Sequence, residues 1–116
     1  MLTKYSVDTE LISSVPTSET FRERNFTADE ISYCNSAADP TASFAGRWAA
    51  KEAVFKALSV PSKGAGAPLK EIEIVSTSSG PTVKLSGDAL AAAGGKSVKV
   101  SLSHSDTSVV AFAVAQ

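Results

Sequence analysis

A carboxylate, that of Glu52, stands among apolar side chains in the segment RWAAKEAVFKAL (residues 47–58), whose pattern predicts one helix. At 3.6 residues per turn, Phe44, Trp48 and Phe55 line one face of this helix, and Glu52 lies at the edge of that face. The opposite face carries only small residues: Gly46, Ala49, Ala50, Ala53 and Ala57. We therefore expect a buried helix that a neighbouring element approaches closely. An unpaired carboxylate is costly there, so Glu52 requires a lysine, a histidine or a metal ion as its partner.

Two further carboxylates are candidates for the same cation. The segment KYSVDTELI (residues 4–12) alternates with the period of a strand. One row holds Tyr5, Val7, Thr9 and Leu11, and the other holds Ser6, Asp8 and Glu10. Asp8 and Glu10 then point the same way, about 7 Å apart, and repel each other unless a cation or a basic side chain lies between them. The alternative for Asp8 and Glu10 is a solvated strand face, and for Glu52 a surface pair with Lys56 worth about 0.2–0.5 kcal/mol.

The single histidine completes a set that could hold magnesium and a phosphate. In SVKVSLSH (residues 97–104), Val98, Val100, Leu102 and His104 share one strand face, so the histidine ends an apolar row at a strand terminus. A purely structural role for this histidine is the alternative. Three acidic residues, a lysine one turn beyond Glu52 and this histidine together suggest a cation bound between carboxylates and phosphate oxygens.

The elements that must position these residues follow from periodicity and helix caps. Thr27 and Glu30 form a capping box, and Asp39 with Pro40 begins the long helix, which we expect to end near Leu58. Shorter helices are predicted over 18–26, 27–38 and 87–95, a hairpin over 69–77 and 82–86, and strands over 97–104 and 108–115. Residues 59–68 are a Gly/Pro-rich loop with one lysine, Lys63, either a mobile lid or a plain connector. The order predicts an α+β domain with a mostly antiparallel sheet packed against a long central helix.

Composition limits the classes of function. The chain has 116 residues, which suits one domain over residues 1–116, and its net charge of −1 gives no steering toward nucleic acid or an anionic membrane. We find no apolar run of about 18 residues and no signal peptide, so we expect an intracellular, cytoplasmic protein. One cysteine, Cys34, and one histidine exclude an internal disulfide and a zinc-type cluster, which leaves a hard cation on oxygen ligands.

Four segments in the right order resemble one family. GRWAAKEAVFKAL is similar to the W-x-x-K-E-A-x-x-K-A signature of 4′-phosphopantetheinyl transferases of the holo-acyl-carrier-protein synthase type, and VSLSHSD resembles the family's [IV]-S-[ILV]-S-H element. VDTELI resembles its acidic strand and RNFTADEISYC its second helix. The chain most resembles the branch that forms the C-terminal transferase domain of fungal fatty acid synthase α subunits. One residue departs from the pattern: Ser6 stands where the family usually has glycine.

The resemblance implies a reaction and its ligands. The reaction moves the 4′-phosphopantetheine arm of coenzyme A to a serine of an acyl carrier protein for fatty acid synthesis and releases adenosine 3′,5′-bisphosphate. Asp8, Glu10 and Glu52 are the implied Mg²⁺ ligands, and the implied catalytic residues are Glu52, as general base, Asp8 and Lys56. Lys56 neutralises phosphate charge, while Lys51 either acts on the nucleotide or faces solvent.

The resemblance also implies partners. The expected coenzyme A contacts are Asp8, Thr9, Glu10, Tyr33, Ser43, Arg47, Glu52, Lys56, Ser103, His104 and Ser105. Arg22 and Arg24 are candidate contacts to the acidic carrier. A homotrimer with sites between subunits is implied, and the strand at 108–115, apolar on both faces, fits it because a second face needs a cover unless the long helix provides one. A free-standing synthase and a non-catalytic carrier-binding or trimer-forming module remain the alternatives.

Overall fold

The computed structural model describes residues 2–62 and 69–116 and has an α+β fold. Two elements carry the site, β1 (Lys4–Leu11) and α3 (Pro40–Leu58). The other helices and short helical turns are η1 (Ile12–Ser14), α1 (Glu19–Asn25), α2 (Ala28–Asn35), η3 (Leu69–Glu71) and α4 (Gly87–Ala93). The other strands are β2 (Ile72–Thr77), β3 (Gly80–Leu85), β4 (Val98–His104) and β5 (Ser108–Ala115). The predicted fold class is confirmed, and each predicted helix and strand is present, but the strand predicted over 69–77 begins only at Ile72, because residues 69–71 form η3, and its partner begins at Gly80.

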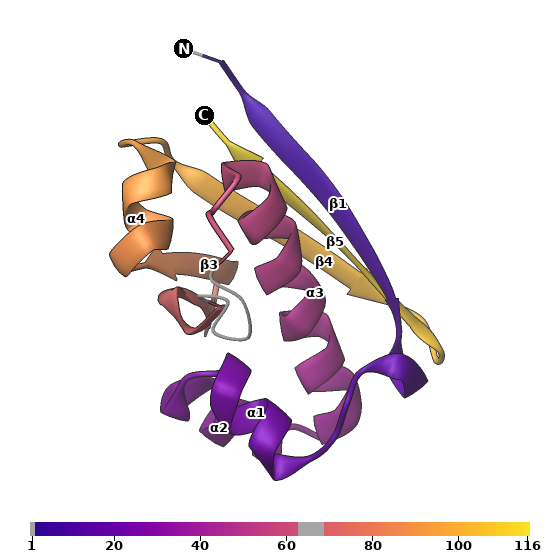
Figure 1. The fold of residues 1–116 in the computed structure, drawn as a ribbon. Coiled ribbons are helices and arrows are strands. Elements are labelled where there is room, and N and C mark those ends of the chain that lie inside the picture. The colour runs from indigo at the N-terminus through magenta and orange to yellow at the C-terminus, as the bar shows by residue number, and fades with distance from the viewer. Residues whose placement is uncertain (1, 63–68) are drawn as a thin grey trace.

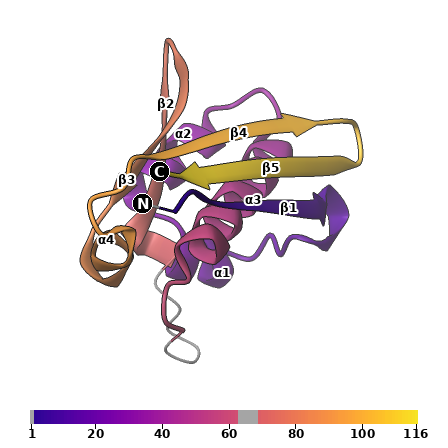
Figure 2. The same ribbon diagram turned by 90° about the horizontal axis from the view of Figure 1, so that it is seen from above.

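The strands form two antiparallel sheets. The larger sheet has the order β1-β5-β4, and β2 and β3 form a separate hairpin. Figure 1 shows α3 lying along one face of the larger sheet, with α1 and α2 at the N-terminal end of α3 and α4 near its C-terminal end. The view from above shows the hairpin standing beside the sheet (Figure 2). One face of each strand in the larger sheet is therefore covered by a helix.

Helix α3 is long and deeply buried for reasons that are visible in its sequence. The Asp39 side chain accepts a hydrogen bond from the Ala42 amide at 3.2 Å, Pro40 occupies the first turn, and Ser59 ends the helix in the left-handed region at φ 54°. The predicted small face is buried against the sheet. At Gly46 a Cβ atom would lie 3.4 Å from Leu102 Cδ1, so the close approach predicted over this face is present.

In β1 the row of side chains that contains Asp8 faces the helix, and the more apolar row faces outward, which is the reverse of what composition alone suggests. Asp8 is 6% exposed, whereas Tyr5 is 71% exposed and Val7 52% exposed. In the register with β5, Asp8 lies opposite Ala111 and shares the face that α3 covers. The alternative of a solvated acidic face is therefore wrong for Asp8, because packing of α3 decides which row is buried.

The choice between a lid and a connector for residues 59–68 falls mainly on 63–68, including Lys63, which lie outside the described residues. Among the helices that the structure describes, none is both long and apolar enough to cross a membrane.

Candidate active site

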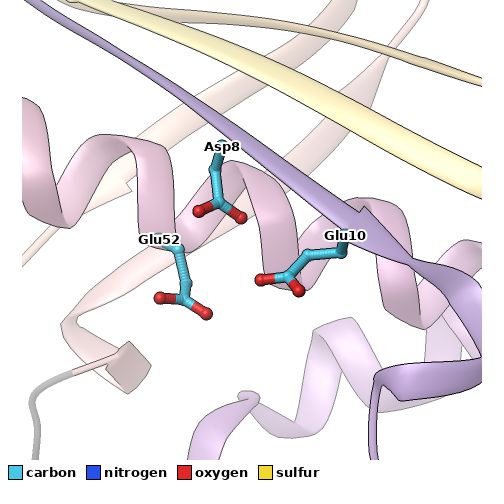
Figure 3. A group of neighbouring side chains, drawn as sticks. All are labelled: Asp8, Glu10 and Glu52. Atoms are coloured by element: carbon cyan, nitrogen blue, oxygen red, sulfur yellow. The ribbon is translucent and has the colours of Figure 1, made fainter.

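Three carboxylates meet between β1 and α3. Asp8 and Glu10 come from the covered face of the strand, and Glu52 comes from the side of the helix that faces it (Figure 3). One oxygen of each carboxylate can be chosen so that all three lie within 4.8 Å of one another. The alternation of β1 and the position of Glu52 at the edge of the aromatic face thus bring together residues that are more than 40 positions apart in the sequence.

The three carboxylates change one another's acidity. Burial raises the pKa of Glu10 to about 7, and the negative charges of Asp8 and Glu52 add to the rise. Burial also raises the pKa of Glu52, and the negative charge of Asp8 adds to the rise. The positive charge of Lys56 opposes it. Within the described part of the chain, Asp8 Oδ2 is buried without a hydrogen-bond partner. The group is therefore short of positive charge and of donors, which is the condition that a bound cation relieves.

Lys56 supplies one positive charge at the edge of this cluster. Its Nζ donates to Asp8 Oδ1 at 2.6 Å, and its side chain is 51% exposed. This hydrogen bond is the largest cause of the raised pKa of Lys56. The alternative in which Lys56 pairs with Glu52 is not what the structure has, since the ammonium group bonds to β1 and acts on Glu52 only through its charge.

The donor set fits Mg²⁺. The three neighbouring carboxylates are hard oxygen donors, the kind that Mg²⁺ and Ca²⁺ take, and Mg²⁺ is the one whose ligands are usually completed by substrate phosphates. The unpartnered Asp8 Oδ2 and the raised pKa of Glu10 are independent signs that this group is incomplete. Asp8, Glu10 and Glu52 are accordingly the residues that would hold the ion.

A second group of predicted residues surrounds the guanidinium of Arg47 on another side of α3. Arg47 donates to the hydroxyls of Ser43, at 3.4 Å, and Ser76, and its Cζ lies 4.0 Å from the centroid of the Tyr33 ring. Arg47 is 7% exposed, and its Nε has no hydrogen-bond partner among the described residues. A hydrogen bond to Ser76, then a hydrogen bond to Arg47 and the charge of Arg47, lower the pKa of Tyr33. A cavity of about 150 Å³ opens beside this group.

A third group lies at the end of the sheet where β4 turns into β5. An open cavity of about 440 Å³ there is lined by Thr9, Ser103, His104, Ser105, Ser108, Val109 and Val110. None of the three clustered carboxylates is among these lining residues. In the register of the sheet, Val109 of β5 separates His104 from Glu10. One chain thus presents the histidine element and the acidic cluster on different strands, without joining them in one cavity.

One predicted basic residue, Lys51, lies where neither of its two expected roles is possible. Lys51 is fully buried and forms an ion pair with Glu30, so it neither faces solvent nor is free to reach a nucleotide. Burial is the main cause of a lowered pKa for Lys51, opposed by the charge of Glu30. Arg22 lies with its Cζ 3.9 Å from the centroid of the Phe44 ring and lines a cavity of about 320 Å³, whereas Arg24 is exposed.

Sequence reasoning missed Ser76 and the second role of Glu30. Ser76 lies near the end of β2 and carries no motif, so nothing in the sequence ties it to Arg47. The capping box of Glu30 is present as predicted, with the Thr27 amide 2.9 Å from Glu30 Oε1, but the same carboxylate also binds α3 and β2. One sequence signal could have pointed to this group: at 3.6 residues per turn, Lys51 and Arg47 lie one turn apart on the same face of α3.

The chain is similar to known proteins over nearly its whole length. A family model described as the 4′-phosphopantetheinyl transferase superfamily matches residues 6–113. Fatty acid synthase subunit alpha of Schizosaccharomyces pombe is 57% identical over 94% of this chain, and that of Saccharomyces cerevisiae is 53% identical over 93%. The chain spans 6% of the length of each of these two relatives.

Solved structures of bacterial synthases share the fold. An ACPS–CoA complex of Chronobacterium ammoniagenes matches with a TM-score of 0.82 and 25% identity, covering 100% of this chain and 98% of that one. A holo-[acyl-carrier-protein] synthase of Helicobacter pylori in complex with coenzyme A matches with a TM-score of 0.81 and 26% identity, covering 97% of this chain and 99% of that one. The chain therefore belongs to the 4′-phosphopantetheinyl transferase superfamily and is an enzyme of the transferase class.

Proposed function

We propose that this chain transfers the 4′-phosphopantetheine arm of coenzyme A to a serine of an acyl carrier protein in a Mg²⁺-dependent reaction. The product is the holo carrier used in fatty acid synthesis, and we place the reaction in the cytoplasm. The observation that carries the proposal is the cluster of Asp8, Glu10 and Glu52 beside Lys56 in a chain of this family. Two further findings support it: solved relatives hold coenzyme A, and sequence relatives are fatty acid synthase subunits.

The chemistry assigns a role to each residue of the cluster. The serine oxygen bonds to the phosphorus that carries the pantetheine, the bond from that phosphorus to the bridging oxygen breaks, and adenosine 3′,5′-bisphosphate leaves with the electron pair. Asp8, Glu10 and Glu52 would hold Mg²⁺, which when bound neutralises charge on the pyrophosphate. Glu52 accepts the serine proton. Lys56 places its positive charge beside the departing phosphate.

The remaining predicted residues bind coenzyme A in two places. Arg47 offers a guanidinium beside a cavity, with Tyr33 and Ser43 around it. The second place is the open cavity at the end of the sheet, lined among others by Thr9, Ser103, His104 and Ser105. Arg22 and Arg24 of α1 are proposed to meet the acidic carrier protein.

Assembly into a homotrimer would join the acidic cluster to the histidine element. The face of the sheet opposite α3 carries exposed apolar side chains from β1 and β5: Tyr5, Val7, Leu11, Val110 and Phe112. The Tyr5 and Phe112 rings stack on this face with centroids 6.3 Å apart. The described residues leave this face uncovered, and an apolar patch of this kind commonly marks an interface. Further copies of the chain are the proposed cover, with His104 of one copy completing the site of another.

A direct assay tests the proposed reaction. The chain is incubated with coenzyme A, Mg²⁺ and an apo acyl carrier protein, and the carrier is weighed by mass spectrometry. We expect the carrier to gain one phosphopantetheine group on its serine. A carrier of unchanged mass, with the chain folded by circular dichroism, would leave the non-catalytic module as the better account.

Mixing two damaged variants tests the shared site. Glu52→Gln and His104→Ala are each expected to be slow at low coenzyme A concentration. If sites lie between subunits, refolding an equimolar mixture restores roughly a quarter of the sites by random assortment into closed trimers. Light scattering on the same samples gives the mass of the assembly. A monomer that is fully active at dilution, or a mixture no faster than its parts, would reject the shared site.

A further inference from the structure

The buried pair of Glu30 and Lys51 joins three elements at one carboxylate. Glu30, on α2, accepts from the Lys51 ammonium on α3 and from the Ile74 amide of β2 at 2.9 Å. It also accepts from the Thr27 amide at 2.9 Å, which fixes the start of its own helix. Both side chains of the pair are almost wholly buried, at 0% exposed for Lys51 and 1% for Glu30. We call Glu30 and Lys51 the hub pair.

Two of the elements that the hub pair joins each carry a contact of Arg47, and the third carries Arg47 itself. Tyr33 lies one helical turn after Glu30 on α2, and Arg47 itself lies one turn before Lys51 on α3. Ser76 lies two residues after Ile74 on β2 and therefore on the same face of the strand. The Tyr33 ring, whose centroid lies 4.0 Å from Arg47 Cζ, and the Ser76 hydroxyl are thus held beside the guanidinium by elements that meet at the Glu30 carboxylate.

Arg47 is held but not fully used by these contacts. Its Nε is buried without a hydrogen-bond partner among the described residues, and the cavity of about 150 Å³ beside it is lined by residues of α2, α3 and β2, including Glu30. Because Arg47 lines this cavity, its guanidinium can meet an acceptor of a ligand bound there, whereas its covered Nε can do so only if neighbouring atoms move. The direction in which the Arg47 guanidinium points depends on how closely α2 and β2 approach α3.

A need for stability alone does not explain a charged pair at this position. Replacing a buried ion pair by apolar side chains of similar volume is often neutral or stabilising, so burial of charge is weak evidence for a stabilising role. The hydrogen bonds of the pair are directional, so they fix the relative positions of α2, α3 and β2. Apolar packing alone is not directional and would allow these elements to slide past one another.

We propose that Glu30 and Lys51 are positioning residues for coenzyme A binding, acting through Arg47. This inference rests on the proposed function. The Lys51 ammonium bonds to Glu30 and not to a carboxylate of the acidic cluster, and both side chains of the hub pair are almost wholly buried. Damage to the hub pair therefore weakens the binding of coenzyme A and leaves the chemical step at Glu52 nearly intact.

The test uses a double variant that removes both charges and keeps the shape. Glu30→Gln with Lys51→Met leaves one carbonyl oxygen, which can replace the acceptor of either the Thr27 or the Ile74 amide but not both, and puts an apolar chain in place of the lysine. We expect KM for coenzyme A to rise about tenfold, the effect of losing one well-placed interaction, while kcat at saturating coenzyme A changes less than about twofold. The dissociation constant of coenzyme A, measured by calorimetry, should rise in parallel. An unchanged KM, or an equal loss of kcat, would overturn the proposal.

A mutant cycle with Arg47→Ala asks whether the hub pair acts through Arg47. If it does, Arg47→Ala in the double variant adds little to the rise in KM, whereas independent effects would multiply. Val54→Ala is the matched control, because Val54 is fully buried on α3 outside this network, so it lowers stability without a rise in KM. A comparable rise in KM for Val54→Ala would reject a specific positioning role.

The remaining outcomes are also decisive. If the double variant does not fold, Glu30→Asp takes its place, since it keeps the charge but draws the carboxylate back from the Ile74 amide, and the same rise in KM is expected. If neither folds, the pair is structural and the proposal fails. A parent chain that neither binds coenzyme A nor modifies a carrier refutes the proposed function instead, so the two failures are distinguishable.

Discussion

Carboxylates are buried in two places in this chain, and the two places treat charge in opposite ways. At the hub pair, one carboxylate meets one ammonium, and further backbone amides bind the Glu30 oxygens. At the acidic cluster, three carboxylates share the single half-exposed ammonium of Lys56, and Asp8 Oδ2 stays unpartnered within the described residues. A chain that can satisfy buried charge so completely in one place, yet leaves it unbalanced in another, has left room there for a ligand.

The comparison predicts that removing a carboxylate has opposite consequences in the two places. In the cluster, Glu52→Gln removes one of three repelling charges, so the metal-free protein keeps its fold with an equal or higher thermal midpoint. Transfer should fall by about a thousandfold, within the range for a lost general base. Steady-state rates and thermal unfolding measure the two effects. Glu71→Gln, at the end of η3, where the carboxylate accepts a hydrogen bond from the Ala89 amide of α4, is the control with wild-type rates. Near-normal turnover of Glu52→Gln would show that the assignment of Glu52 is wrong.

At the hub pair, the loss of a carboxylate should instead cost stability. Glu30→Ala leaves the Lys51 ammonium buried without its partner and two backbone amides without their acceptor. We expect the free energy of unfolding to fall by about 3–5 kcal/mol, as for other broken buried pairs. Denaturant unfolding measures this change. A loss below about 1 kcal/mol, typical of an exposed pair, would remove the contrast between the two places.

The two lysines should differ in the same way. Lys56→Ala removes a half-exposed charge, so we expect at most about 1 kcal/mol of lost stability. The substitution should instead change the kinetic constants, because a positive charge near the phosphates is lost. We expect kcat to fall and KM for coenzyme A to rise, which together lower kcat/KM by about 10- to 100-fold. Lys70→Ala, an exposed lysine on η3, serves as the control. Unchanged kinetic constants for Lys56→Ala would leave Lys56 as a surface partner of Asp8 only.

A smaller effect should appear in the pH dependence of stability. Because the pKa of Glu10 is raised from 4.5 to about 7, the folded metal-free protein binds more protons than the unfolded chain between these values. The contribution of Glu10 to stability is therefore present at low pH and is lost as pH rises through about 7. Thermal midpoints of the chelated protein, wild type against Glu10→Gln, should diverge across this window. Parallel profiles would mean that Glu10 titrates normally.

The sequence specifies local features of this site better than distant ones. The cap at Asp39, the capping box of Thr27 and the small face of α3 were all predictable, because each depends on neighbouring residues along the chain. The side of β1 that is buried was not, since its apolar row argued for the opposite face and only the packing of α3 decides it. The hub pair was also missed, because its partners lie 21 residues apart on elements whose approach no local pattern encodes.

The central claim is that the acidic cluster is completed by Mg²⁺ before transfer can occur. The most direct measurement is the rate at which an apo carrier gains phosphopantetheine, followed by mass spectrometry after exhaustive chelation and again as Mg²⁺ is restored. The account predicts that the rate falls to background with the fold intact by circular dichroism, and recovers as Mg²⁺ is added. Transfer that continues unchanged in the chelated protein would show that the carboxylates of Asp8, Glu10 and Glu52 serve the fold and not the reaction.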